Sequence, residues 1–139
     1  MVWVGDEIGG YGWLSTSPEW VGEIGAELQL RPGDGYIWNC FTVPQHRRKG
    51  IFRSLLIGIP RIAREEGLRR LWIGTVAIPA EKVVGPSGFT PVISWAGFAF
   101  AGRLFSIEIA RDSELIREAR EIFGGSPGIH LRRLRTRRH

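Results

Sequence analysis

A basic, glycine-containing segment between a strand-like run and a helix-like run carries the clearest chemical pattern in the sequence. It spans residues 43–56 and reads VPQHRRKGIFRSLL. Backbone N–H groups in the first turn of a helix have no intrahelical acceptor, and the helix dipole favours negative charge there. Gly50 permits a positive φ angle or a close backbone approach. Four cationic side chains surround the turn: Arg47, Arg48, Lys49 and Arg53. This pattern predicts a binding site for a phosphorylated ligand.

Other residue types that support catalysis are scattered. Cys40 is the single cysteine and has no histidine partner close to it in the sequence, so we expect it to pack in a strand rather than to act as a nucleophile. One cysteine also excludes an internal disulfide and suits a reducing compartment. The histidines His46, His130 and His139 lack the spacing of metal ligands, and we expect no metal site.

The elements that must position the basic segment follow from the hydrophobic pattern. Residues 36–43 (YIWNCFTV) are rich in aromatic and β-branched side chains, which predicts a strand buried on both faces. Residues 51–66 have a helical apolar face, and Pro60 predicts a kink or an end of its first half. Residues 71–76 predict a second buried strand. Two parallel strands joined by a right-handed crossover are therefore expected.

Shorter elements on either side complete the predicted fold. Further strands are predicted at residues 2–4, 8–15, 24–30, 89–100 and 104–110, and further helices at residues 78–84 and from Asp112 or Ser113 to residue 123. The fold class is α/β (α+β), with a mixed, mostly antiparallel central sheet and helices on its faces. We predict one domain over residues 1–128 and a basic tail over residues 129–139.

The distribution of charge restricts the expected partners. The net charge of +5 comes from five arginines after Gly128, since residues 1–128 carry 14 basic and 14 acidic residues. A nucleic-acid partner is therefore the less favoured interpretation and depends on residues 129–139. Charges interrupt the most apolar stretch, residues 89–110, so we expect no membrane span. No secretory signal is visible, and a cytoplasmic location is expected.

The order of these elements and the basic motif together resemble the GNAT superfamily of acetyl-CoA-dependent N-acyltransferases. The acyl-CoA motif of that family is Q/R-x-x-G-x-G/A, and residues 47–52 (RRKGIF) match it except at Phe52. Three dipeptides also agree with the family: Val43-Pro44, Leu55-Leu56 and Gly88-Phe89. The resemblance covers residues 2–109. It implies the GNAT-like fold without the first strand and two helices that usually shape the acceptor pocket.

The resemblance implies transfer of an acetyl group from acetyl-CoA, a cosubstrate, to a primary amine of a small molecule or peptide. Backbone amides from about Gln45 to Ile51 would bind the CoA pyrophosphate, and the strand ending at Val43 would pair with the pantetheine arm. The splay between the strands at 36–43 and 71–76 would admit the thioester, and an amide near Phe41 would help to hold the oxyanion. The implied cofactor-binding residues are Phe41, Thr42, Val43, Gln45, Arg47, Arg48, Lys49, Gly50, Ile51, Phe52 and Arg53.

Proton-transfer residues are the weak part of the resemblance. Val84 stands where many relatives carry a tyrosine acid, and Ala77 stands where an asparagine often lies. Asn39 occupies a strand position at which several relatives place a carboxylate. Glu27 and Glu23 are alternative bases by proximity of strands, and a water chain is a further alternative. Asn39 and Glu27 are the candidate catalytic residues.

Two other functions stay open. The chain could be a catalytically degenerate CoA-binding or assembly module, or a nucleic-acid-binding protein that uses residues 129–139. The chain is a shortened member, or its start lies upstream of Met1, or a partner chain covers the gap that the missing N-terminal elements leave. An incomplete sheet face gives a reason to form a homodimer. Tryptophans 13, 38, 72 and 95 are expected to pack in the core or on a sheet face. Some of them could instead line an acceptor pocket for an apolar or aromatic substrate.

Overall fold

The computed structural model describes residues 1–21, 26–75, 78–100, 103–112, 114–124 and 129–133. They belong to two compact units. The first unit comprises Met1–Ser17 and Leu30–Phe89, and the second comprises Pro18–Gln29 and Thr90–His139. The described residues form a mixed α+β structure with mostly antiparallel strand pairing and three α-helices, which confirms the predicted fold class.

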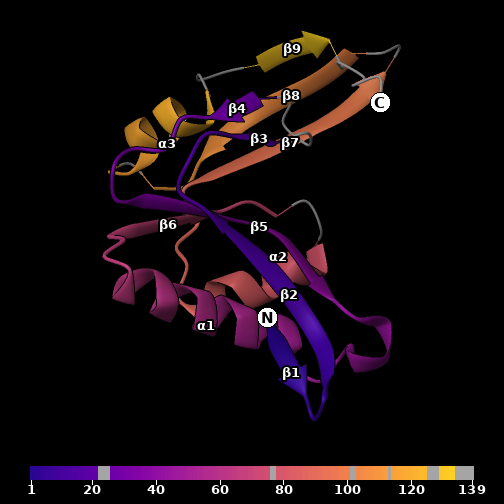
Figure 1. Ribbon diagram of the computed structural model, residues 1–139. Helices are drawn as coiled ribbons and strands as arrows, with labels where there is room; N and C mark the ends of the chain where they lie inside the picture. Colours follow the sequence, from indigo (N-terminus) through magenta and orange to yellow (C-terminus); the bar gives the residue numbers. More distant parts are fainter. Residues whose placement is uncertain (22–25, 76–77, 101–102, 113, 125–128, 134–139) are drawn as a thin grey trace. The chain divides into compact units, whose positions relative to one another are not determined.

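A four-stranded sheet with the order β1-β2-β5-β6 forms the first unit (Figure 1). Its strands are β1 (Val2–Val4), β2 (Glu7–Ser15), β5 (Asp34–Thr42) and β6 (Arg70–Ile73). The pairs β1/β2 and β2/β5 are antiparallel, whereas β5 and β6 are parallel. The parallel pair confirms the strand–helix–strand unit that the sequence predicts.

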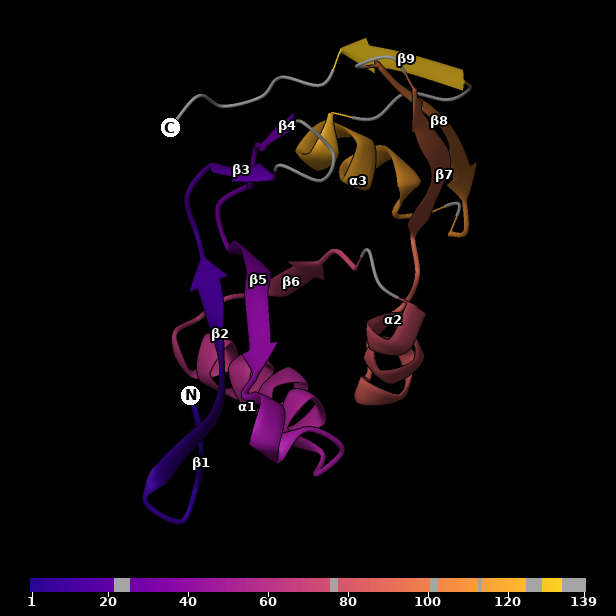
Figure 2. The ribbon, with the colours of Figure 1, turned by 90° about the vertical axis from the view of Figure 1, so that its right-hand side faces the viewer.

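Helix α1 (Ile51–Glu65) connects β5 to β6 and covers one face of the sheet. Figures 1 and 2 both show it lying along β2 and β5. Its buried side chains are Ile51, Leu55, Leu56, Ile59 and Ala63. Gly12 on β2 permits this close packing, because an added Cβ would lie 2.8 Å from Cys40 Sγ and 3.0 Å from Ile59 Cδ1. The helix does not end at Pro60 but continues to Glu65.

Only the first half of β5 is buried as the sequence predicts. Residues 34–37 are buried, but Trp38, Asn39 and Phe41 are exposed. The prediction of burial on both faces is therefore wrong for the second half. Pairing with β6 ends at Ile37, and α1 covers only one face of the sheet. The second half of the apolar segment of β5 therefore has no neighbouring element of this unit over its other face.

Helix α2 (Ile78–Val84) and the short 3₁₀ helix η2 (Gly85–Ser87) complete the described part of the first unit. Both contact α1. The bounds of α2 agree with the predicted helix, and Val84 forms its last residue. Ala77 lies outside the described residues.

The second unit contains two small antiparallel sheets. One pairs β3 (Glu19–Val21) with β4 (Ala26–Leu28), and the other has the order β7 (Ile93–Phe100), β8 (Arg103–Ala110) and β9 (Ile129–Arg133). Helix α3 (Ile116–Phe123) buries Ile122 and Phe123. The Phe123 ring packs edge-on against Trp95, with 5.9 Å between the ring centroids.

Strands β3 and β9 are absent from the elements that the sequence predicts. The first five residues of the predicted basic tail, Ile129–Arg133, form β9 and pair with β8. Residues 134–139 lie outside the described part of the chain, and the domain boundary at residue 128 stays a prediction. None of the helices in the described part is long and apolar enough to cross a membrane.

Candidate functional site

Two residues of the loop between β5 and α1 have unusual backbone conformations. Arg48 (φ 64°) and Gly50 (φ 78°) have left-handed backbone conformations on either side of Lys49. Such alternation turns successive N–H groups toward one side and creates an anion-binding nest. Helix α1 then begins at Ile51 with no side-chain cap, so its first-turn N–H groups keep their capacity to bind an anion.

The charge around this loop is positive. Arg47, Arg48, Lys49 and Arg53 are exposed and form no ion pair with another residue that the structure describes. The first turn of α1 contains no acidic residue. Phe52 is half-buried, and its backbone N–H belongs to that first turn. The loop therefore combines a helix N-terminus, a nest and unpaired cations at one place.

A buried histidine anchors the start of the loop. His46 ends the 3₁₀ helix η1 (Pro44–His46), and its Nε2 atom lies 3.2 Å from Oε2 of Glu7 on β2. The Val43 N–H also donates to the Gly9 carbonyl oxygen at 3.0 Å. Both contacts tie the loop to β2. The anchoring role of His46 has no local signal in the sequence, because 39 residues separate it from Glu7.

A β-bulge interrupts the pairing of β2 with β5. Tyr11 pairs with Phe41 and Trp13 pairs with Trp38, so Gly12 stands opposite two residues, Asn39 and Cys40. An extra residue of this kind bends a strand and redirects its side chains. Asn39 has a φ angle of 45°, which asparagine tolerates better than most residues. The bulge starts two residues after Ile37, the last β5 residue that pairs with β6.

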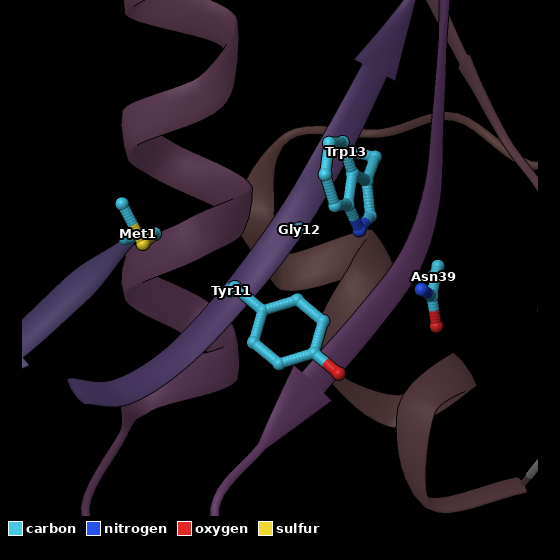
Figure 3. Close-up of a pocket in the computed structure, with 5 residues that line it drawn as sticks. All are labelled: Met1, Tyr11, Gly12, Trp13 and Asn39. Atoms are coloured by element: carbon cyan, nitrogen blue, oxygen red, sulfur yellow. The ribbon is translucent and has the colours of Figure 1, made fainter.

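A pocket of about 410 Å³ lies at the bulge. Figure 3 shows Tyr11 and Trp13 projecting from β2 and Asn39 from β5. Two further residues complete the lining: Met1 and Gly12. Gly12 contributes backbone, because its missing side chain would point toward Cys40 and α1.

Aromatic rings pair across the two strands at this pocket. The Tyr11 and Phe41 ring centroids lie 5.5 Å apart, and those of Trp13 and Trp38 lie 6.1 Å apart. We call these four side chains the aromatic face. Residues directly opposite in an antiparallel pair project to the same side of the sheet, so each pair of rings shares a side. Tyr11 and Trp13 flank Gly12, which faces α1, and successive residues of a strand alternate. All four rings therefore lie on the side of the sheet away from α1.

Cys40 lies at the bulge but packs on the opposite side, against the core formed by Ile37, Leu55 and Ile59. Burial raises the pKa of its thiol above the ordinary value of 9.0. A raised thiol pKa lowers the fraction of nucleophilic thiolate at neutral pH. This environment agrees with the packing role that the sequence predicts for Cys40.

The predicted site residues fall into two groups. The cofactor-binding candidates from Phe41 to Arg53 are brought together, because they form the end of β5, the loop and the first turn of α1. Asn39 lies beside them at the bulge. Glu27 lies on β4 in the second unit, where its Oε2 atom accepts a hydrogen bond from Gln29 Nε2 at 3.2 Å. Glu23 lies outside the described residues. The roles of all these residues stay predictions.

A comparison with protein families shows to which family the chain belongs. A model described as the acetyltransferase (GNAT) family matches residues 1–83. The chain belongs to the GNAT acetyltransferase family. The match includes β2, the bulge, the basic loop and α1, whereas Val84 and Gly88-Phe89 follow the matched segment. No curated protein and no solved structure matches this GNAT chain.

Proposed function

We propose that this GNAT protein transfers the acetyl group of acetyl-CoA to a primary amine of a small molecule or peptide. Family membership implies acetyl transfer in general, and the donor and the acceptor are our proposal. One observation supports it most directly: the nest at Arg48–Gly50 lies at the N-terminus of α1. An anion-binding loop next to a strand with an unpaired edge suits a ligand that has a pyrophosphate and an extended amide-containing arm.

The loop would bind the pyrophosphate of acetyl-CoA. Its backbone N–H groups donate to phosphate oxygens without depending on side-chain type, so Phe52 retains this function despite its bulk. Arg47, Arg48 and Lys49 add charge-assisted hydrogen bonds, which are stronger than neutral ones. Gly50, with its left-handed conformation, connects these loop N–H groups to those of the first turn of α1.

The second half of β5 would bind the pantetheine arm. The described pairing with β6 ends at Ile37, so the edge of β5 from Trp38 to Thr42 has no strand partner on that side. An extended arm with amide groups can add to such an edge as a strand does. The thioester would then lie near the bulge, where a backbone N–H near Phe41 can stabilise the developing oxyanion.

The reaction requires no covalent enzyme intermediate. The acceptor first loses a proton from its ammonium form to water. Its nitrogen lone pair then forms the C–N bond to the acetyl carbon, and the carbonyl π electrons move onto the oxygen as the oxyanion. The carbonyl double bond re-forms as the C–S bond breaks. The CoA thiolate leaves and, through water, takes up the proton that the nitrogen releases. The side-chain carbonyl of Asn39 can accept a hydrogen bond from the amine, which positions it but does not remove its proton. Positioning and electrostatics supply the rate enhancement.

Calorimetry and a thiol assay together test this proposal. Acetyl-CoA is expected to bind with micromolar affinity. S-acetylpantetheine, which lacks the pyrophosphate, is expected to bind at least tenfold more weakly because the loop then has no ligand. CoASH release is expected with at least one amine of a broad panel. Folded protein that does not bind acetyl-CoA would contradict the proposal.

A catalytically degenerate CoA-binding module is the second candidate. It is favoured by Asn39, whose amide takes up no proton, and by the absence of acidic or basic side chains from the pocket lining. Acetyl-CoA binding without CoASH release from any amine would support this candidate over the enzyme.

A further inference from the structure

We propose that the pocket at the β5 bulge is the acceptor site, and that the acceptor is a small amine carrying an aromatic ring. This inference rests on the proposed function, because it names the substrate class of the same site. It follows from the size of the pocket, the aromatic face around it and the type of polar group that it offers.

The volume of about 410 Å³ suits a small molecule, since pockets for such ligands measure roughly 300–1,000 Å³. Tyr11 and Trp13 stand two residues apart on β2, with the backbone of Gly12 between them (Figure 3). The lining therefore offers two aromatic rings beside glycine backbone and little polar surface. Such a lining suits a planar aromatic ring better than a highly hydrated group.

Exposed aromatic side chains concentrate at this place. Trp13 is 55% exposed, and Trp38 and Phe41 are each 38% exposed. Single exposed apolar residues are ordinary, but a contiguous group marks a binding surface. Paired rings can stack on an incoming aromatic group, and a ring face also attracts an ammonium ion. The aromatic face therefore matches both parts of an aromatic amine.

The polar side chains that line the pocket favour an amine with a single positive charge over more highly charged amines. Asn39 supplies the one side-chain amide of the pocket, and the five lining residues include no carboxylate. A polyamine or a lysine-rich peptide carries additional positive charges that would lack a counter-ion here. A single amine needs only a hydrogen-bond acceptor, and Asn39 Oδ1 provides one. Asn39 also belongs to the bulge, next to the strand edge proposed for the thioester arm.

The test compares three amines in the CoASH-release assay: phenethylamine, its saturated analogue cyclohexylethylamine, and spermidine. We expect phenethylamine to have the highest kcat/KM, at least about tenfold above that of spermidine, because ring stacking and cation–π attraction act together. The Trp13→Ala variant is expected to lower kcat/KM for phenethylamine about tenfold, mainly by raising KM, and Trp13→Phe to restore most of it. The Kd of acetyl-CoA should stay unchanged in both variants.

Trp3→Ala is the matched control, because Trp3 is 57% exposed but does not line the pocket. It is expected to leave kcat/KM for phenethylamine unchanged. A higher kcat/KM for spermidine would overturn the inference, as would an unchanged KM in Trp13→Ala. Acetyl-CoA binding without turnover of phenethylamine would also overturn it. A protein that does not bind acetyl-CoA at all would instead contradict the proposed function, so the two failures are distinguishable.

Discussion

Trp38 and Phe41 lie on the same face of β5, although they stand three positions apart along the strand. Side chains of a regular strand alternate between faces, so an odd separation would place them on opposite sides. The extra residue of the bulge opposite Gly12 restores them to one side. The bulge therefore creates the aromatic face, and it does so at the position where β5 separates from β6.

Charge reversal in the loop should weaken cofactor binding. We expect Arg47→Glu to raise the Kd of acetyl-CoA at least about tenfold and to reduce its salt dependence, because a charge-assisted contact becomes a repulsion. Isothermal titration calorimetry at two salt concentrations measures both effects. Arg61→Glu on the exposed side of α1 makes the same change in net charge and should leave the Kd unchanged. Equal effects of the two variants would argue against a phosphate contact at Arg47.

Gly50→Ala should destabilise the loop because of the backbone conformation at residue 50, without any steric clash of the added methyl group. Nothing lies within 4 Å of a Cβ at this position, but its φ angle is +78°, and a left-handed non-glycine residue costs about 1–2 kcal/mol. Urea unfolding should show this loss of stability, and calorimetry should show a higher Kd for acetyl-CoA. Gly58→Ala within α1 is the control. It is expected to raise stability by about 0.5–1 kcal/mol, because alanine favours the helix interior. A stabilising effect of Gly50→Ala would contradict the left-handed conformation.

Alkylation of the single cysteine should be slow at neutral pH. Because burial raises the pKa of the Cys40 thiol above 9.0, we expect the rate with iodoacetamide to increase through a midpoint above that value. Since the folded state holds this proton more tightly than the unfolded state, stability should fall as the pH rises above the ordinary pKa. Cys40→Ala should retain CoASH release. A rapid reaction at neutral pH would contradict the buried environment.

Removing only one partner of an ion pair in the second unit should lower the stability of that unit. Arg120 Nε lies 2.8 Å from Oε1 of Glu108, whose side chain is fully buried. Arg120→Met is expected to destabilise this unit by about 3–5 kcal/mol, because it leaves a buried carboxylate without its partner. The double variant with Glu108→Leu should recover most of that loss. Thermal unfolding of the single and double variants measures the difference, and no recovery in the double variant would argue for a role of Glu108 beyond this pair.

Several elements could be predicted because neighbouring residues specify them. The apolar spacing of α1 and the β-branched and aromatic run of β5 indicate a strand–loop–helix unit, and its parallel return to β6 follows from connection rules. Strands β3 and β9 were missed because each is short and depends on a partner strand, β4 or β8, for its hydrogen bonds.

The sequence by itself determined the basic loop for which we propose anion binding. Its charges, its glycine and its helix start lie within a few residues, and local backbone preferences suffice to place them together. The tertiary structure alone decided the pocket. Gly12 and Asn39 meet because of the strand register, and a shift of one residue at the bulge decides which aromatic rings share a face. Register depends on pairing between distant residues, so no local pattern in the sequence could have revealed it.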